Sequence, residues 1–404
     1  MSTNNLTANY TKIFGTISKN LPHNAVAMDV AGKIAHNRLK STRDRYYTED
    51  KFSEGYISDV VLGADNNIQG FTGSQVSIDS RATYVEYSFL LDSIDKERYL
   101  NSPEWLVNRA KDARKQIVRK VDGTFFNGAS AGAGVTVDMG KFGGSTGTAI
   151  DFSPTNVVDV LAGAKAELRA LNGGVAEKLC AVVSEKSFGS IESKATTVGF
   201  RYADKAINVG MKGSMLDLDI YVSPYLTHEI DLTMSDVAVA DDTLVIGGVT
   251  FTAKASPAAA GEFDVEESAT DQATTIAAFI NNPATTTANF VAITDKASLA
   301  ALNGYTATSS AGVVTITHKY GEASISAAGL TNGAVGTQRS HNVVMEKGAY
   351  ELCMPNGIIS EERLEPRQRR SNFITEGYFG TGFLGFNNQK VAKLVTLAQN
   401  KTIS

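Results

Sequence analysis

The hexapeptide GTGFLG at residues 380–385 matches the pattern G-x-G-x-x-G of dinucleotide-binding loops. In such loops a buried strand precedes the glycines, a helix begins at them, and an acidic residue follows about 20 residues later. Here the hexapeptide follows RQRRSNFIT (367–375), which is not a buried apolar strand. The last residues, NKTIS (400–404), include no acid. The context therefore argues against a dinucleotide site.

We expect this glycine-rich stretch to belong to a strand that closes the fold and packs beneath a long helix. In an extended chain Phe379 and Phe383 share one face, and Phe386 lies on the other. The glycines between them permit a bulge or a close approach of another backbone. Replacing Gly382 by Val is then expected to damage folding or assembly and to affect no bound ligand.

Other residues that carry chemistry lack the spacing that the chemistry requires. Cys180 and Cys353 lie in apolar runs, form no CxxC pair, and are expected to be buried thiols. The sequence contains no HExxH, P-loop or G-x-S-x-G pattern. The histidines are scattered, with none at metal-ligand spacing from another: His23, His36, His228, His318 and His341. The sequence predicts no catalytic residue, no metal and no cofactor, and hence no enzyme.

The composition, with 43% hydrophobic and 20% charged residues, is that of a globular chain. A formal net charge of -5 argues against a protein whose main purpose is to bind nucleic-acid phosphates. No run approaches the ~18 apolar residues of a membrane span. The N-terminus MSTNNLTANYTKIF lacks the basic and apolar regions of a signal peptide. We expect a cytoplasm-like compartment.

A long amphipathic helix is predicted over 101–128, with Ser102 as N-cap, Pro103 at its first position and Gly128 at its end. Apolar residues recur every three or four positions: Leu106, Ala110, Ala113, Ile117, Val121 and Phe125. The opposite face is basic: Arg109, Lys111, Arg114, Lys115, Arg119 and Lys120. Such a face either binds nucleic acid or is a solvated or subunit-facing helix surface, and we favour the second interpretation.

Before this helix, residues 1–24 read as an extended arm, and residues 25–40 as one short helix with Ile34 on its apolar face. The segment 46–95 alternates apolar and polar residues in its second half and is rich in turn residues in its middle. It is predicted to be one long hairpin that projects from the body. The exposed edges of such a hairpin need a cover, for which a neighbouring subunit is one candidate.

After the long helix, residues 151–226 read as a compact α+β unit. A helix is expected to start with Ser153-Pro154 and to bury Leu171, followed by a buried strand over 178–184 and a second helix over 187–195. Two strands joined by a glycine-containing turn are expected within 207–226.

Residues 227–339 differ in composition and read as a β-rich domain inserted between two adjacent strands of the host unit. From Glu229 to Val335 there are about 12 acids against about 3 bases, which leaves the remainder near +4. A hairpin with a Gly-Gly turn is expected over 243–252, a helix capped by Asp271 over 271–282, and a strand over 312–320.

The order of these elements resembles the major capsid proteins of tailed double-stranded DNA bacteriophages, which share the Hong Kong 97-type fold. The segments that carry the resemblance are the hairpin of 46–95, the helix SPEWLVNRAKDARKQIVRKVDGTFFNG, the strands INVGMKGSMLDLDIYVSPYL and SHNVVMEKGAYELCMP, and the closing RSNFITEGYFGTGFLGFNNQKVAKLV. The fold class implied is α+β, with an N-terminal arm, an extended β-hairpin loop, a spine helix, an axial domain and an inserted β-rich domain. Residues 227–339 depart from the minimal family pattern.

The resemblance implies the following division of the chain: arm 1–45; extended loop 46–95; peripheral domain 96–150 and 360–404, with spine helix 103–127; axial domain 151–226 and 340–359; insertion 227–339. It also implies that the closing strands return to the peripheral domain.

The function implied is a coat protein that assembles through pentamers and hexamers into an icosahedral virion shell in the host cytoplasm. Implied partners are copies of the chain, a scaffolding protein, a portal and decoration proteins, with double-stranded DNA enclosed without sequence-specific binding. The alternatives are the shell of a bacterial nanocompartment, a soluble enzyme, or a tail-tube protein. Candidate intersubunit contacts are Asp50, Lys51, Phe52, Asn66, Asn67, Phe71, Arg109, Arg114, Arg119, Arg367, Arg369 and Arg370.

Overall fold

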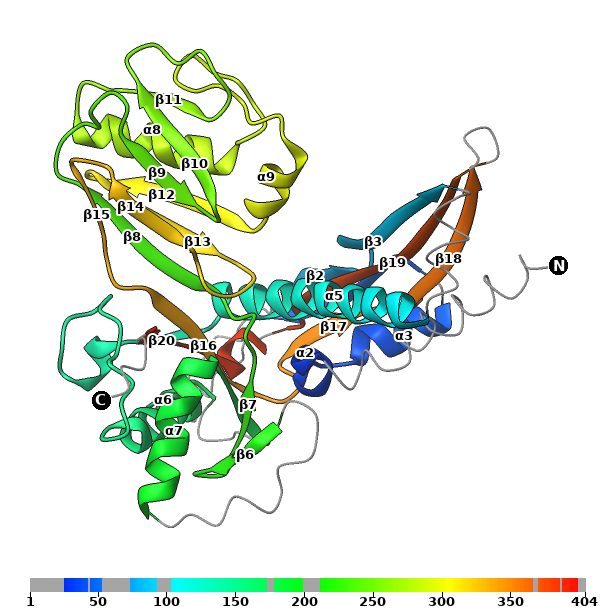
Figure 1. The fold of residues 1–404 in the computed structure, drawn as a ribbon. Helices are drawn as coiled ribbons and strands as arrows, with labels where there is room; N and C mark the ends of the chain where they lie inside the picture. Colours follow the sequence, from blue (N-terminus) through cyan, green and yellow to red (C-terminus); the bar gives the residue numbers. More distant parts are fainter. Residues whose placement is uncertain are drawn as a thin grey trace, which may run out of the picture.

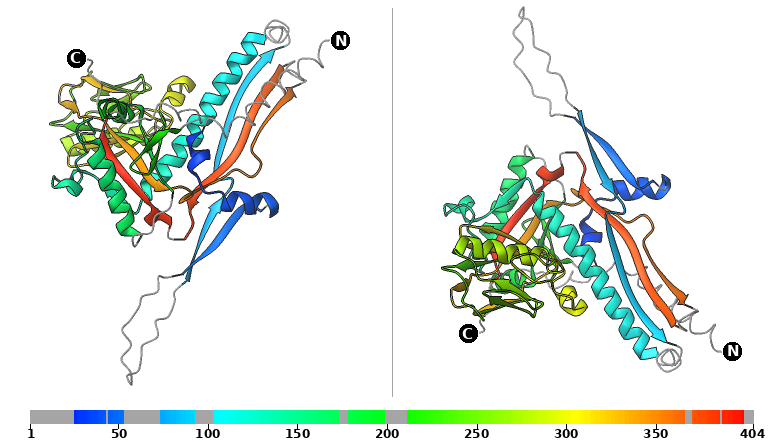
Figure 2. Two further views of the ribbon diagram at one scale, coloured as in Figure 1. Left: turned by 90° about the horizontal axis from the view of Figure 1, so that it is seen from below. Right: turned by 90° about the horizontal axis from the view of Figure 1, so that it is seen from above.

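The computed structural model describes residues 25–42, 44–52, 73–92, 103–172, 178–198, 211–365, 370–385 and 387–398. They form a mixed α+β structure built around one long helix, α5 (Pro103–Ala131) (Figure 1). A sheet of long strands runs beside this helix, and a compact α+β unit with α6 and α7 lies near its C-terminal end (Figures 1 and 2). A second unit, which contains β8–β15, lies on the opposite side of the helix from this compact unit (Figure 1).

Helix α5 confirms the predicted amphipathic pattern. Its buried face consists of Ala110, Ala113, Ile117, Val121 and Phe125, while Ser102 and the side chain of Leu106 lie outside the described residues. The predicted end at Gly128 was wrong, because the helix continues to Ala131. Gly128 instead makes room for a neighbour: a Cβ there would lie 3.0 Å from Cζ of Tyr350 and closer still to its hydroxyl oxygen.

The sheet beside α5 has strand order β17-β19-β18, and β3 pairs with the other edge of β19. All these pairings are antiparallel. Val85, Tyr87 and Phe89 of β3 point to the helix side, and Phe89 stacks on Phe373 with ring centroids 5.1 Å apart. Alternation along β3 therefore builds one apolar face, as predicted. The bounds are β3 (Thr83–Asp92), β17 (Tyr350–Cys353), β18 (Ile358–Glu365) and β19 (Arg370–Phe383).

A second, two-stranded ribbon leaves the body in a different direction (Figure 2). Strands β1 (Tyr46–Phe52) and β2 (Gly73–Asp79) pair antiparallel from Tyr46↔Asp79 to Phe52↔Gly73. The expectation of one hairpin running from 46 to 95 was wrong, because β3 pairs with β19 instead. Long-range pairing partners of this kind leave no local signal in the sequence.

The glycines of GTGFLG lie where β2 crosses β19. A Cβ at Gly380 would sit 1.9 Å from the carbonyl oxygen of Asp79, and one at Gly382 would sit 3.0 Å from Cγ1 of Ile78. Phe379 is fully buried and Phe383 packs against the same core as α5, as expected for one face of a strand, whereas Phe386 lies outside the described residues. The glycine pattern serves a close backbone crossing.

We expect Gly380→Ala to destabilise the protein more than Gly382→Ala. At residue 380 the added methyl meets a backbone oxygen, whereas at residue 382 it meets a side chain that can shift. Overpacking costs typically ~1–3 kcal/mol, and we place Gly380→Ala at the upper end and Gly382→Ala at the lower end. Urea unfolding followed by circular dichroism measures both, and equal midpoints for the two variants would contradict the close crossing.

The predicted single helix over 25–40 was wrong, since two helices occur: α2 (Val26–Val30) and α3 (Ile34–Thr42). Between them the backbone of Gly32 pairs with β17, accepting from the N–H of Leu352 at 3.1 Å. Ile34, expected on the apolar face, is 53% exposed. A backbone pairing between distant segments therefore overrides the local helical spacing.

The compact unit contains α6 (Val157–Leu171), η2 (Met139–Phe142) and α7 (Glu185–Val198) packed against strands. Helix α6 starts after the predicted Ser153-Pro154, and Leu171, predicted to be buried, is exposed. The expected glycine turn was also wrong, because Leu216 and Asp217 join β6 and β7 with positive φ values of 56° and 59°.

The strands of this unit belong to a ten-stranded sheet whose main order is β12-β13-β8-β16-β5-β7-β6, with β15 on β8, and β4 and β20 attached beside β16. The strands that flank the insertion in sequence, β7 and β16, are separated by β5, so the expectation that they are adjacent was wrong. β20 pairs with β16 and β4 rather than with the sheet of β3, β19 and β18. The bounds are β4 (Val135–Val137), β5 (Leu179–Val183), β6 (Met211–Met215), β7 (Leu218–Val222), β16 (Arg339–Glu346) and β20 (Val391–Leu397); η4 (Asn387–Lys390) precedes β20.

Residues of 230–330 form a hydrophobic cluster of their own. It includes both faces of α8 (Ala269–Asn281) and one face of the β9–β10 hairpin, whose turn is Gly247-Gly248 as predicted. The cap of α8 is Ser268 rather than Asp271, because Ser268 Oγ accepts from the N–H of Asp271 at 3.2 Å. The remaining elements are β8 (His228–Met234), β9 (Thr243–Ile246), β10 (Val249–Lys254), β11 (Glu262–Asp264), α9 (Lys296–Ala301), β12 (Tyr305–Ser310), β13 (Val313–His318), β14 (Ile325–Gly329) and β15 (Gly333–Val335).

Candidate assembly surfaces

The predicted contact residues fall into groups that the fold keeps apart. Asp50 is exposed on β1, together with the backbones of Lys51 and Phe52, whose side chains lie outside the described set. Arg109, Arg114 and Arg119 lie on α5, and the β1–β2 ribbon points away from that helix (Figure 2). Of Arg370 only the backbone is described. The others lie outside the described residues: Asn66, Asn67, Phe71, Arg367 and Arg369.

The β1–β2 ribbon has few apolar contacts with the body, chiefly those of Ile78 and the half-buried Tyr47. Among the described residues of the ribbon, only Ile78 is an apolar side chain buried in the body. Its polar contacts are on its own surface: Arg45 donates to both carboxylate oxygens of Asp79, at 2.9 and 2.7 Å, and Gln75 donates to Asp50 at 3.0 Å. No described strand pairs with the outer edge of β1 or of β2. An isolated two-stranded ribbon is marginal in water, so these edges need a partner.

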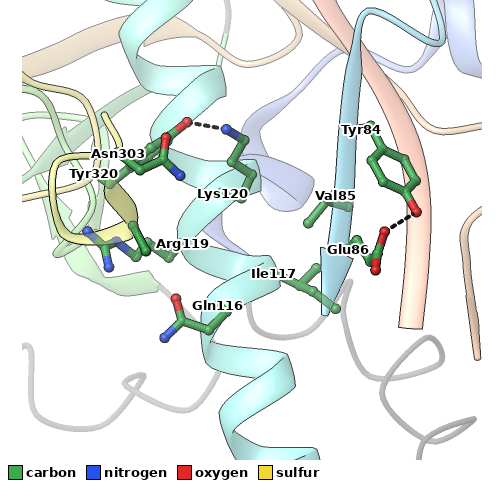
Figure 3. Close-up of a pocket in the computed structure, with 10 residues that line it drawn as sticks. Tyr84, Val85, Glu86, Gln116, Ile117, Arg119, Lys120, Asn303 and Tyr320 are labelled. Atoms are coloured by element: carbon green, nitrogen blue, oxygen red, sulfur yellow. Dashed lines mark hydrogen bonds between the residues drawn. The ribbon is translucent and has the colours of Figure 1, made fainter. Parts of the chain in front are cut away.

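The basic face of α5 divides into two parts. Arg119 and Lys120 face Tyr320, which follows β13 (Figure 3). Lys111, Arg114 and Lys115 lie on another side of the helix and line a groove. The stripe predicted from the sequence is therefore not one surface.

Tyr320 fastens the unit of β8–β15 to α5. Lys120 Nζ donates to its hydroxyl oxygen at 2.5 Å and lies 4.9 Å from the ring centroid, and the Arg119 guanidinium lies 5.7 Å from the centroid on the same ring system. The ring rests on Gly123, where a Cβ would lie 2.8 Å from the carbonyl oxygen of Lys319 and closer still to the ring. A cavity of about 330 Å³ remains between α5, β3 and this unit (Figure 3).

Two neighbouring residues complete this docking loop, which we define as residues 319–322. Gly321 bridges to Thr227, and Glu322 pairs with Lys186 at 2.9 Å. The loop thus contacts both α5 and α7, in addition to the β8–β16 pairing that joins this unit to the host sheet.

Tyr320→Ala is expected to weaken the contact between the docking loop and α5, while both hydrophobic cores remain folded. Removal of the ring takes away the aromatic contact, both cation–π contacts and the hydrogen bond, whereas Tyr320→Phe loses only the hydrogen bond, which is worth ~1 kcal/mol. Hydrogen exchange of the amides in 319–322 should accelerate about tenfold or more in the Ala variant and less in the Phe variant. Unchanged exchange in Tyr320→Ala would contradict a fastening role.

Two buried carboxylates hold the N-terminal helices. Asp122 of α5 is 1% exposed and accepts from the N–H groups of Val26 and Ala27 at 3.2 and 3.0 Å. Glu351 of β17 is fully buried, and its Oε2 accepts from the N–H of Ala35 at 3.2 Å. Carboxylates at helix N-termini accept hydrogen bonds from backbone N–H groups that have no partner within the helix, and their negative charge interacts favourably with the helix dipole. Burial raises the pKa of Asp122 to about 7 and raises that of Glu351.

The docking of α2 should depend on pH through Asp122. Because its folded-state pKa of about 7 lies above the value of about 3.9 in unfolded chains, folding takes up a proton. The favourable contribution is complete below about pH 4 and is lost as pH rises through about 7, by at most ~1.4 kcal/mol per pH unit. Asp122→Asn should flatten the slope of stability against pH in this window. Urea unfolding midpoints between about pH 4 and 7 measure this slope, and Asp236→Asn serves as an exposed control. An unchanged slope in Asp122→Asn would contradict the role of Asp122 in the pH dependence.

The described residues show no group of three or more His, Cys, Asp or Glu that could hold a metal ion. The histidines there are used structurally: His228 Nδ1 lies 2.9 Å from the carbonyl oxygen of Leu226, His318 Nδ1 contacts two carbonyl oxygens, and His341 Nε2 lies 2.9 Å from Glu229. Cys180 and Cys353 are buried free thiols whose pKa values burial raises to about 12. No helix in the described part of the chain is both long and apolar enough to cross a membrane.

Sequence patterns missed Asp122, Glu351, Gly123 and Tyr320. The one available signal was the position of Asp122 on the otherwise apolar face of α5, next to Val121, where a carboxylate requires a buried partner. The partners of the other three come from segments far away in sequence, so no local signal existed for them.

No family model and no curated protein matches the sequence. Among solved structures, 114 chains match. One is from Mycobacterium phage Che8, with 10% identity and a TM-score of 0.49, covering 92% of this chain and 90% of that chain. Another is from the head of Helicobacter pylori bacteriophage KHP40, with 9% identity, a TM-score of 0.44, and coverage of 93% and 91%. A third is from the capsid of Cyanophage P-SCSP1u, with 9% identity, a TM-score of 0.42, and coverage of 88% and 84%.

The matches to structures described as a phage capsid or head cover about nine tenths of this chain. Because these TM-scores are below 0.5, the matches carry no argument about function, and we infer the function of this chain from its own geometry.

Proposed function

We propose that the chain is the major capsid protein of a tailed double-stranded DNA bacteriophage, built on the Hong Kong 97-type fold. It assembles through hexamers and pentamers into the icosahedral shell of the virion head, in the host cytoplasm. In this proposal α5 is the spine helix, β1 and β2 are the base of the extended loop, and residues 227–339 are an inserted domain.

The observation that carries this proposal is the β1–β2 ribbon. It projects from the body with both outer edges unpaired in the described structure and with one buried apolar anchor, Ile78. A long exposed ribbon of this kind gains stability when a neighbour covers it. A head-to-tail contact, in which the ribbon of one copy meets a different surface of the next, closes into rings.

The work of such a subunit requires many modest contacts and no catalytic group. Each contact is weak enough to be corrected during assembly, and multivalency makes the finished shell stable. A rigid α5 with the β3–β19–β18 sheet against it gives each copy a fixed shape on which these contacts depend. The shell of a bacterial nanocompartment remains the alternative within the same architecture.

The charge distribution favours a genome container. The insertion is acidic and the remainder is near +4, so the chain as a whole is not built to bind DNA tightly. Salt-dependent binding of DNA to empty shells measures this property, and tight binding near physiological salt would contradict it. A scaffolding protein, a portal and decoration proteins are the further partners that the proposal implies.

Shortening the ribbon should abolish assembly while leaving the fold intact. The register Tyr47↔Ile78 allows the chain between these residues to be replaced by Asn-Gly, which forms a two-residue hairpin turn. We expect the free energy of unfolding of the shortened chain to stay within ~1 kcal/mol of the parent, because the cores are untouched. It should sediment as a monomer.

Sedimentation velocity and electron microscopy of both proteins, alone and with phage lysate, measure assembly. Asp236→Asn serves as a surface control that should still assemble. Rings or shells formed by the shortened chain would contradict the role of the ribbon. A full-length chain that stays strictly monomeric in all conditions would overturn the capsid proposal, and particles that enclose an enzyme instead of DNA would favour the nanocompartment.

A further inference from the structure

A groove of about 470 Å³ runs along α5. One wall consists of Lys111, Arg114 and Lys115, whose positions at i, i+3 and i+4 put them within about one helical turn. The other walls come from Val26 of α2, from the segment Val222–Tyr225 after β7, and from Glu185 at the start of α7. The groove is thus formed by four segments that are distant in sequence.

The cations of this groove have no acidic partner in the described part of the chain. No ion pair joins Lys111, Arg114 or Lys115 to a described Asp or Glu. By contrast, Lys120 on the same helix contacts Tyr320, and Lys347 pairs with Asp219 at 2.6 Å. The positive charge in the groove is therefore not used within the described fold.

The floor of the groove decides which anion fits. Val26, Val118 and Val222 are almost fully buried, Tyr225 is half-buried, and Pro224 is exposed. Apolar floors bind side chains, whereas a nucleic-acid backbone gains little from them. A run of phosphates cannot avoid the carboxylates of Asp122 and Glu185, which also lie in the lining, whereas a peptide can place its acidic side chains opposite the cations alone. A peptide with separate acidic and apolar side chains fits both features.

We propose that the α5 groove binds an acidic, amphipathic peptide segment of a separate protein. Carboxylates of the peptide pair with Lys111, Arg114 and Lys115, and an apolar side chain lies against Val118, Val222 and Tyr225. Because Lys111 and Lys115 are one turn apart, about 6 Å along the helix, two carboxylates at similar spacing engage both.

The binding is tested on the purified full chain in its unassembled form, so the result does not depend on shell assembly. The probe is a fluorescein-labelled peptide of Glu and Leu, with two Glu one helical turn apart and Leu between them. Fluorescence anisotropy should detect salt-sensitive binding. The triple variant Lys111→Glu, Arg114→Glu, Lys115→Glu should weaken it about tenfold or more, since reversed charges repel the peptide.

A charge-matched control places the same reversals at Lys33, just before α3, and at Arg38 and Lys40 on α3, which are all exposed and outside the groove. This variant should bind like the parent, and equal loss in both triple variants would overturn the proposal by showing non-specific attraction. A second probe with Ser in place of Leu should bind more weakly, and equal affinity would overturn the apolar contact. A short DNA duplex that binds more tightly than the peptide and loses affinity in the groove variant would assign the site to nucleic acid instead. Circular dichroism of each variant confirms that it is folded.

Discussion

Helix α5 touches several otherwise separate parts of the chain, and each contact uses a different physical means. Its apolar face packs against β3 and β19, and Phe125 meets Tyr350 of β17 with ring centroids 5.0 Å apart. Its Asp122 accepts hydrogen bonds from the N-terminus of α2, and its Gly123 makes room for Tyr320 of the β8–β15 unit. Apolar burial supplies most of the stability, while the polar and steric contacts decide how the attached parts are oriented.

The sequence predicted the elements whose signals are local. The three-to-four spacing of Ala110, Ala113 and Ile117 identified α5, the apolar run of 179–183 identified β5, and Gly247-Gly248 identified a hairpin. These features depend on residues close in sequence, for which periodicity and turn preferences are direct physical consequences of backbone geometry.

Two errors were local, namely the cap of α8 at Ser268 and the Leu216-Asp217 turn, and the others concern contacts between distant segments. The pairing of β3 with β19, the break between α2 and α3 at Gly32, and the position of β20 beside β16 are each fixed by a partner far along the chain. Contacts between distant segments also explain why the sequence did not define the candidate surfaces. The basic face of α5 could be read from the residue types, but only the positions of Tyr320 and Tyr225 show that it divides into two parts.

The packing of Tyr320 against Gly123 also fixes the rotational position of α5 relative to the β8–β15 unit. Successive residues of an α-helix are turned by about 100°, so a single residue gained or lost in α5 between the sheet contacts and Gly123 would rotate the hole away from the ring. It would equally rotate Asp122 away from α2 and Phe125 away from Tyr350. We infer that relatives with the same packing vary in length at the ends of α5 and in surface loops, and keep the number of residues between Ile117 and Phe125 constant.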